Sequence, residues 1–380
     1  MRVLMTCGGT GGHIYPALAI ASTIKVNNPD AAVAFVGTSQ GKETELVPRA
    51  GYPLYYIKIQ GIRRSLSPAN LITAWYIFTA PRHAKKLIRE YKPDIVIGTG
   101  GYACWPTLKA AADLGIPTMV HESNALPGLA VNMLKKKVDR ILINFAQTRD
   151  LLKLPDEEKA KKVVVVGNPT RAGFGAGTMP QEAKRKLNIE SYRCFVMSFG
   201  GSLGAEVINE CALGLMEEIA RRHPDILYMH AAGARYYGKM KEALVQKGLA
   251  AAANILLCDY IHDMPQRMAA ADIVISRAGA MTISELAAAG CAAILIPSPN
   301  VVDNHQFKNA KVLADAGAAL LLEESELRGN SRFADTVLGL AGDPAARGRL
   351  SRNIRKFADK DANKLIYAEI QKLLAQKTEK

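Results

Sequence analysis

Short, mostly apolar runs alternate along the chain with longer segments in which apolar residues recur at helical spacing. The first apolar run begins at residue 2 and stops at a Gly-Gly-Thr-Gly-Gly turn, residues 8–12, and a helical pattern follows. A second apolar run, 31–36, ends at Gly37 and Thr38. Strand, helix and strand in this order form a β-α-β unit, so the pattern predicts an α/β protein with a parallel sheet.

The same pattern restarts half-way along the chain. The apolar run 194–199 enters a second glycine turn, 200–205, and another helical segment follows. The remaining strand-like runs are 52–62, 94–97, 116–120, 138–143 and 163–166, and then 226–229, 254–257, 273–275 and 292–296. Residues 167–171 break the pattern and are predicted to connect two domains. We therefore expect two Rossmann-like domains, 1–166 and 167–354, whose parallel sheets face each other across a deep cleft.

A glycine turn between a strand and a helix is a place to hold an anion or a polar ligand group. Glycine lets the backbone approach closely, and the first N–H groups of the helix point outward. His13 is the only side chain of the first turn that titrates near neutral pH. An NAD site is not predicted, because the third fingerprint glycine is missing and the second strand ends in Gly37 and Thr38, where a ribose-binding acid is expected.

Polar side chains also gather where two later strands end. A further glycine turn, 98–102, follows one strand, and His121, Glu122 and Asn124 follow the next. Ligands of open α/β sheets lie at this carboxyl edge, which favours a functional site. The alternative is that these side chains only cap the loop.

The second half offers a carboxylate near the start of a helix. The spacing of Thr282 and Glu285 fits a capping box. The alternative is that Glu285 binds a ribose diol while the helix N-terminus faces a diphosphate. Gln306 is either a sugar-binding residue or an ordinary helix-start residue. Asp359 and Asp361 form a D-x-D sequence in a charged helix rather than at a strand end, so no metal site is predicted there.

Net charge and cysteine content indicate the kind of partner the protein binds and the redox compartment in which it works. The net charge of +14 indicates anionic partners, although dispersed surface lysines would give the same number. Six cysteines lie far apart without a C-x-x-C pair, which predicts buried free thiols in a reducing cytosol and neither a zinc nor a redox site. The first apolar run is too short for a signal peptide, and the chain lacks the run of about eighteen apolar residues that spans a bilayer.

Residues 71–89 combine an apolar face with a basic end. Helical spacing places Leu71, Trp75 and Phe78 on one face. The basic cluster that follows consists of Arg82, His83, Lys85, Lys86 and Arg89. Such a segment can bind an anionic membrane surface, or it can be a core helix with a solvated end.

The motifs together resemble one family, the bacterial MurG glycosyltransferases, which have the GT-B fold. The resemblance extends from residue 8 to residue 306 in the family's order. Its segments are Gly8-Gly9-Thr10-Gly11-Gly12-His13, Gly98-x-Gly100-Gly101-Tyr102, His121-Glu122-x-Asn124, Gly167-Asn168-Pro169-x-Arg171, Gly200-Gly201-Ser202-x-Gly204-Ala205, Arg277-x-Gly279-Ala280-x-Thr282-x-Ser284-Glu285 and His305-Gln306.

The resemblance implies transfer of N-acetylglucosamine from UDP-GlcNAc to lipid I, which gives lipid II at the cytoplasmic face of the membrane in peptidoglycan synthesis. It implies an N-terminal acceptor domain that associates with the membrane and a C-terminal donor domain, with the last helix, about 355–380, packing back on the first. Its partners would be UDP-GlcNAc, lipid I, an anionic membrane surface and other cell-wall synthesis proteins, without nucleic acid and without a cofactor.

The resemblance also assigns binding residues. Glu285 would hold the ribose hydroxyls, Ile261 would frame the uracil, and Gln306 would hold the sugar with His305 beside it. The residues around the diphosphate would be Ser202, Ala280, Met281 and Thr282, with Arg171 nearby. The residues that reach the donor sugar or the acceptor would be Thr10, Gly11, Gly12 and Asn124.

Inverting transfer requires a base that takes the proton of the acceptor hydroxyl as it attacks. His13 is the leading candidate, and His121 and Glu122 are weaker ones. Backbone N–H groups can stabilise the departing diphosphate without a protein-bound metal. Two other interpretations are a different GT-B enzyme, such as a UDP-sugar epimerase or a transferase with a soluble acceptor, and a nucleic-acid-binding protein. The absence of an RNA-binding signature argues against the last.

Overall fold

The computed structural model describes residues 1–59, 69–170, 174, 180–201, 204–301, 304–329, 331–358 and 362–378, with the backbone alone at 69–74, 77, 78 and 378. It forms two compact units. Unit 1 is Met1–Arg171 together with Asp361–Lys380, and unit 2 is Ala172–Lys360. Three features predicted from the sequence lie outside the described residues: Arg171, Ser202 and the D-x-D sequence at 359–361.

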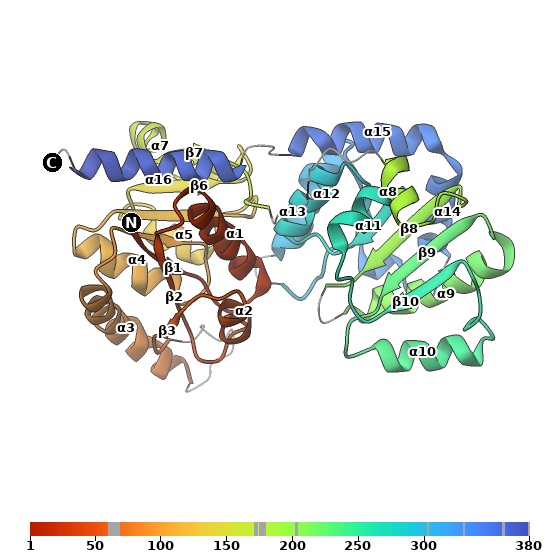
Figure 1. Ribbon diagram of the computed structural model, residues 1–380, viewed down its shortest axis with the longest axis horizontal. Helices are drawn as coiled ribbons and strands as arrows, with labels where there is room; N and C mark the ends of the chain where they lie inside the picture. The colour runs from red at the N-terminus through yellow and green to blue at the C-terminus, as the bar shows by residue number, and fades with distance from the viewer. Residues whose placement is uncertain are drawn as a thin grey trace. The chain divides into compact units, whose positions relative to one another are not determined.

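Unit 1 contains a parallel sheet that has seven strands among the described residues, in the order β3-β2-β1-β4-β5-β6-β7 (Figure 1). Val3 in its central strand pairs with Val33 on one side and with Ile95 on the other. The strands are β1 (Arg2–Thr6), β2 (Ala32–Gly37), β3 (Leu54–Tyr56), β4 (Ile95–Gly98), β5 (Thr118–Glu122), β6 (Arg140–Ile143) and β7 (Val163–Val165).

Helices cover both faces of this sheet, which is why its central strands are mostly apolar. They are α1 (Gly11–Asn27), α2 (Glu43–Arg49), α3 (Ala69–Tyr91), α4 (Cys104–Asp113), α5 (Leu129–Leu134), α6 (Thr148–Leu151), α7 (Asp156–Lys162) and α16 (Ala362–Thr378). One core lies under α1 and α16 and the other under α3, α4 and α5. The strand predicted over 52–62 is shorter in the structure, where β3 extends only from Leu54 to Tyr56.

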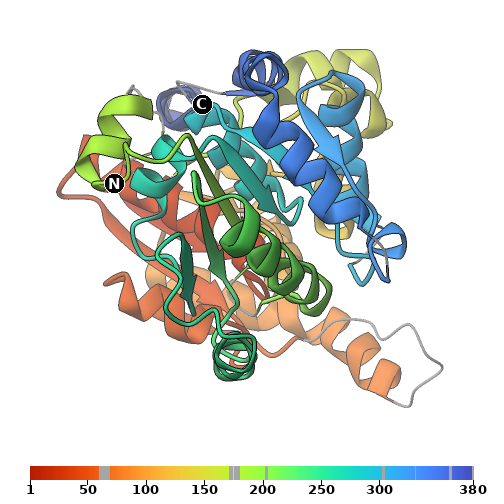
Figure 2. The same ribbon diagram turned by 90° about the vertical axis from the view of Figure 1, so that its right-hand side faces the viewer.

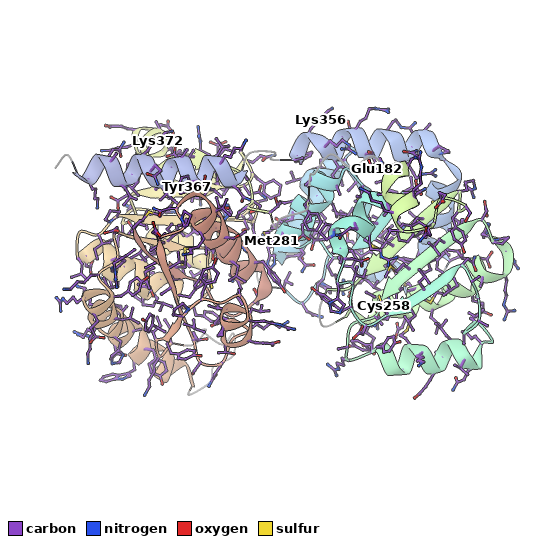
Figure 3. All side chains as sticks on the ribbon, in the orientation of Figure 1. Glu182, Cys258, Met281, Lys356, Tyr367 and Lys372 are labelled. Carbon is purple, nitrogen blue, oxygen red and sulfur yellow. The ribbon has the colours of Figure 1, made fainter. Side chains whose placement is uncertain are left out.

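The last helix, α16, belongs to unit 1 although the chain reaches it after unit 2. It contacts α1 and lies beside it in Figure 1. Ile366, Ile370 and Leu373, spaced by one helical turn, are buried in the core that α1 also covers. Tyr367 packs against the same core, whereas the Lys372 side chain is 65% exposed (Figure 3). The sequence predicted one tail helix from about 355, but residues 355–357 form a separate 3-10 turn, η3 (Arg355–Phe357).

Unit 2 repeats the design with a parallel sheet that has six strands among its described residues, in the order β10-β9-β8-β11-β12-β13. Val196 in the central strand β8 pairs with Tyr228 and with Ile273. The strands are β8 (Cys194–Phe199), β9 (Ile226–Ala231), β10 (Ile255–Cys258), β11 (Ile273–Ser276), β12 (Ala292–Leu295) and β13 (Ala319–Leu321). The short β13 was not predicted from the sequence.

The helices of unit 2 flank its sheet. They are α8 (Pro180–Lys186), α9 (Glu206–Arg222), α10 (Tyr237–Gln246), α11 (Met264–Ala270), α12 (Ala280–Ala289), α13 (His305–Asp315), α14 (Arg332–Gly342) and α15 (Pro344–Ile354), with a 3-10 turn η2 (Glu324–Glu326). Helix α9 contacts β9 and runs along this part of the sheet in both views (Figures 1 and 2). Its buried Ile208, Leu215 and Ile219 share a core with Tyr228.

Candidate active site

In unit 1 the strand order reverses beside β1, because β2 and β3 lie on one side and β4 to β7 on the other. Open α/β sheets bind ligands at such a switch point, outside the carboxyl ends of the strands. The glycine turns that follow β1 and β4 both lie there. Gly101 has a φ of +89°, and a Cβ on it would lie 2.3 Å from the carbonyl oxygen of Gly8. The two turns therefore pack directly against each other and tolerate no side chain at Gly101.

His13 lies between these two turns. Helix α1 begins at Gly11, after the extended N-cap residue Thr10, so His13 is in its first turn. The Nδ1 atom of the half-buried ring lies 3.2 Å from the carbonyl oxygen of Gly8. The ring also faces Gly100, where a Cβ would lie 2.6 Å from Cδ2 of His13. On the backbone side, the Thr99 hydroxyl donates to the carbonyl oxygen of His13 at 2.6 Å.

A buried carboxylate that sequence analysis missed supports the first turn. Glu43, at the start of α2, is 0% exposed. Its Oε2 accepts the N–H of Gly9 at 2.9 Å, and its Oε1 accepts the N–H and the hydroxyl of Thr38 at 2.9 and 2.7 Å. The signal in the sequence is a glutamate that closely follows two glycines, Gly37 and Gly41, and Thr38, where a ribose-binding acid is expected in a dinucleotide-binding fold.

His121 lies inside unit 1 rather than at its surface. Its side chain is 0% exposed, and Nε2 lies 2.8 Å from the carbonyl oxygen of Gly167, which can only accept. Nε2 therefore carries the proton, and Nδ1 faces the Ser123 hydroxyl at 3.4 Å. Burial lowers the pKa of His121 to about 4, so the ring is neutral near pH 7. Burial and the bond to Gly167 disfavour His121 as the catalytic base. The catalytic role of His121 stays a prediction.

Glu122 organises the loop that follows β5. Its Oε1 accepts the backbone N–H of Asn124 at 3.0 Å and the side-chain amide of Asn124 at 3.1 Å, and its Oε2 accepts the N–H of Gly128 at 2.7 Å. Burial raises the pKa of Glu122, and the hydrogen bonds from Gly128 and Asn124 oppose that shift. These contacts are those of a loop cap, and they hold the half-buried Asn124 in a fixed orientation. The catalytic role of Glu122 stays a prediction.

The sheet of unit 2 has its own switch point between β8 and β11. The turn after β8 contains Gly204, whose φ is +77° and whose Cβ would lie 2.1 Å from the carbonyl oxygen of Ala232. The turn after β11 leads into α12, whose N-cap is Gly279. Ala280 and Met281 are buried at the start of α12, and Thr282 is half-buried. Figure 3 labels Met281.

The capping-box interpretation of Glu285 is wrong. A capping box needs its Ser or Thr at the N-cap and its Glu at the third helical position. Because Gly279 is the N-cap, Thr282 is the third residue of α12 and Glu285 the sixth. Glu285 is 7% exposed, so its carboxylate is a buried group one turn further along the helix. Ribose binding by Glu285 stays a prediction.

The first residues of α13 lie close to the start of α12. The side-chain amide of Asn309 donates to the carbonyl oxygen of Ala278 at 3.3 Å and joins the two helices. Oε1 of Gln306 accepts the N–H of Ser298 at 2.9 Å, which fixes the loop after β12. His305 and Gln306 are both half-buried. Ile261, after β10, is 2% exposed and so is buried inside the unit.

The structure thus groups the predicted residues into two sets. Unit 1 brings together Thr10, Gly11, Gly12 and His13 at its switch point, with Asn124 on the loop after β5. Unit 2 holds Ala280, Met281, Thr282, Glu285, His305 and Gln306 near the starts of α12 and α13. Within the described residues, no group of three or more His, Cys, Asp or Glu side chains is arranged to hold a metal ion.

Comparison with known families identifies both halves of the chain. Residues 3–143 match the glycosyltransferase family 28 N-terminal domain, and residues 195–366 match the family 28 C-terminal domain. The chain belongs to glycosyltransferase family 28. This family, together with the relatives described next, confirms the resemblance to the MurG enzymes and the GT-B fold of two Rossmann-like domains.

The relatives agree over nearly the whole length of this family 28 chain. One is the UDP-N-acetylglucosamine–N-acetylmuramyl-(pentapeptide) pyrophosphoryl-undecaprenol N-acetylglucosamine transferase 1 of Bacillus cereus, 42% identical over 88% of this chain and 89% of the relative. A second relative, whose name is the same without the final number, is from Acetivibrio thermocellus and is 40% identical over 99% of both chains. The crystal structure of Acinetobacter baumannii MurG superposes with a TM-score of 0.77 at 28% identity, covering 98% of this chain and 99% of that one.

More distant structures share only the fold. The structure of the UDP-GlcNAc 2-epimerase of Neisseria meningitidis, solved with UDP-GlcNAc, has a TM-score of 0.64 at 14% identity. The match covers 98% of this chain and 100% of the epimerase chain.

Proposed function

We propose that this family 28 chain transfers N-acetylglucosamine from UDP-GlcNAc to the muramoyl 4-hydroxyl of lipid I and so forms lipid II in peptidoglycan synthesis. The observation that carries the proposal is the position of His13, held between two glycine turns at the switch point of unit 1. The names and the close similarity of the relatives support the choice of donor and acceptor.

The chemistry requires proton removal on one side and charge stabilisation on the other. His13 takes the proton of the acceptor hydroxyl as its oxygen forms a bond to the anomeric carbon. The bond from that carbon to the diphosphate oxygen breaks, and UDP leaves with the electron pair. Attack opposite to the leaving group inverts the anomeric centre.

The departing diphosphate is stabilised by the glycine turns and helix N-termini of unit 2. The N-cap residues of helices α9 and α12 are Ala205 and Gly279, neither of which has a side chain that can cap the first N–H groups. Such groups suit a phosphate oxygen. In this proposal the residues around the diphosphate are Ser202, Ala280, Met281 and Thr282, with Arg171 nearby.

The nucleoside and the sugar would bind beside that diphosphate. Glu285 is buried one turn into α12, where a carboxylate can accept hydrogen bonds from a ribose diol. Gln306 and His305 open α13, which Asn309 ties to the start of α12. Ile261 would contact the uracil, and Asn124 with Thr10, Gly11 and Gly12 would contact the donor sugar or the acceptor.

The acceptor's lipid is proposed to stay in an anionic membrane surface that helix α3 contacts, on the cytoplasmic face. Trp75 is 68% exposed, whereas Ala80, Ala84 and Ile88 of the same helix are buried in the core. The second half of α3 is thus a core helix, and its first half presents an exposed aromatic ring. Among the described residues no helix is long and apolar enough to cross a bilayer. The side chains of Leu71 and Phe78 lie outside the described residues.

A transfer assay tests this function. Labelled sugar from UDP-GlcNAc, UDP-GalNAc and UDP-Glc is offered with a short-chain lipid I analogue, and the product is characterised by NMR. We expect transfer from UDP-GlcNAc with a β-linked product. Epimerisation of UDP-GlcNAc without transfer, or transfer only to soluble sugars, would contradict the proposal.

A further inference from the structure

Glu43 and His13 are joined through a single peptide group. The N–H of Gly9 donates to Oε2 of Glu43 at 2.9 Å. The carbonyl of the same peptide, that of Gly8, lies 3.2 Å from Nδ1 of His13. The carboxylate and the imidazole therefore bind opposite ends of one peptide dipole.

This arrangement fixes the tautomer of the imidazole. A carbonyl oxygen has no proton to give, so Nδ1 of His13 must be the donor in its contact with Gly8. In the neutral ring the lone pair is then on Nε2. A carboxylate at the N–H end polarises the peptide and makes its carbonyl a stronger acceptor, which favours this tautomer further.

The carboxylate has little freedom to turn away. Its other oxygen is held by the N–H and the hydroxyl of Thr38 at 2.9 and 2.7 Å. Gly37 and Gly41 leave no room beside it, since a Cβ on either would lie 2.6 or 1.9 Å from atoms of the Glu43 side chain. On the opposite side of the peptide, the close approach of Gly101 fixes Gly8.

A thiol near this carboxylate does not compete with it. It is the buried thiol of Cys7, which directly follows β1 and interacts electrostatically with Glu43 and with the thiol of Cys104 at the start of α4. Burial raises the pKa of both thiols, that of Cys104 to about 12, so they are uncharged near neutral pH.

We propose that Glu43 is a positioning residue which, through the peptide between Gly8 and Gly9, holds the proton of His13 on Nδ1 and keeps Nε2 as the basic nitrogen. The proposal rests on the proposed function, because it gives His13 its catalytic role. It requires a carboxylate at residue 43 and a glycine turn at residues 8–12, and the chain has both.

Long-range ¹⁵N–¹H NMR of histidine-labelled protein, read together with turnover, tests the proposal. In the unaltered protein the neutral His13 ring should show the Nδ1–H tautomer. In Glu43→Gln, whose amide cannot accept at both positions, we expect a measurable population of the Nε2–H tautomer. We also expect kcat to fall by about tenfold or more, the size of one hydrogen bond to a charged group, with the donor KM nearly unchanged.

Two further variants make the result decisive. Glu369→Gln removes another buried carboxylate of unit 1, one that binds Lys372 at 2.7 Å on α16, and should leave the His13 spectrum unchanged. Thr38→Val keeps the charge of Glu43 but removes one donor to it, and should shift the tautomer in the same direction to a smaller extent. If Glu43→Gln does not fold, this variant decides the question.

An Nδ1–H tautomer that is unaffected by both Glu43→Gln and Thr38→Val would overturn the proposal, as would an Nε2–H tautomer in the unaltered protein. The spectrum reads this coupling independently of activity. Failure of the proposed function would instead appear as normal turnover in His13→Ala.

Discussion

Nε2 of His230 lies 3.0 Å from the side-chain oxygen of Asn209, and this contact is the centre of a buried polar chain in unit 2. The Ser198 hydroxyl lies 2.7 Å from both Nδ1 of His230 and the hydroxyl of Tyr228. At the other end, the Asn209 amide donates to the carbonyl oxygen of Ala232, the atom that packs against Gly204. The chain thus links the core of the sheet to the turn after β8.

Both buried histidines should make the protein sensitive to acid. Burial lowers the pKa of His121 and of His230 to about 4, below the value of about 6.5 in an unfolded chain. Between those values the unfolded state binds protons that the native state does not, so the free energy of unfolding falls as pH falls, by up to about 1.4 kcal/mol per pH unit for each ring. Urea unfolding at pH 7, 6 and 5 measures the slope. His121→Gln should flatten it, and an unchanged slope in that variant would show that this ring does not titrate in this way.

The packing of the two glycine turns predicts a strong effect at Gly101. Gly101→Ala places a Cβ on the Gly8 carbonyl oxygen at a positive φ, so the turn must move and turnover should be lost. Gly51→Ala is the matched control, because Gly51 also has a positive φ, +83°, but nothing lies within 4 Å of its Cβ position. The control should lose about 1 kcal/mol of stability and keep its activity. Thermal unfolding and turnover distinguish the two, and equal behaviour would contradict the packing argument.

Glu285 should matter for the donor rather than for the helix. Because Gly279, not Thr282, is the N-cap of α12, Glu285→Ala removes no cap. We expect the affinity for UDP to fall by about ten- to a hundredfold, as for a lost hydrogen bond to a charged group. Titration calorimetry with UDP measures this affinity. A lower melting temperature with unchanged UDP affinity would assign Glu285 to the fold alone.

The membrane proposal is best tested away from Lys85, since its ammonium group already pairs with Asp113 at 3.1 Å. Trp75→Ser and Lys86→Glu change exposed side chains of α3. Both should reduce binding to anionic vesicles in sedimentation assays and leave activity on a short-chain acceptor intact. A parallel loss of activity on the short-chain acceptor would mean that this segment supports the fold or the site instead.

The sequence predicted the two sheets well because their central strands are buried on both faces. Such strands are mostly apolar and lead into glycine turns, as β1 and β8 do. Strand β13 was not predicted because it has only three residues, Ala319–Leu321, and alanine and leucine are also common in helices.

The site was less predictable where the role of a residue depends on its burial in the fold rather than on its type. His13 and His121 both follow strand-like runs, but only His121 is fully buried. Its ring contacts the carbonyl of Gly167, a residue far along the chain, and the sequence does not show this contact. Glu43 was missed because two of the three donors to its carboxylate are backbone N–H groups, which leave no pattern of side chains. Thr282 and Glu285 have capping-box spacing, but the first residue of the helix is Ala280 and its N-cap is Gly279. Thr282 is therefore not at the N-cap position.

The most direct measurement compares His13→Ala with the unaltered chain in single-turnover transfer to a short-chain lipid I analogue, with donor affinity measured in parallel. The account predicts that UDP-GlcNAc binding is kept while transfer slows by about a hundredfold or more, as for loss of a general base. Transfer at the unaltered rate in His13→Ala would contradict it.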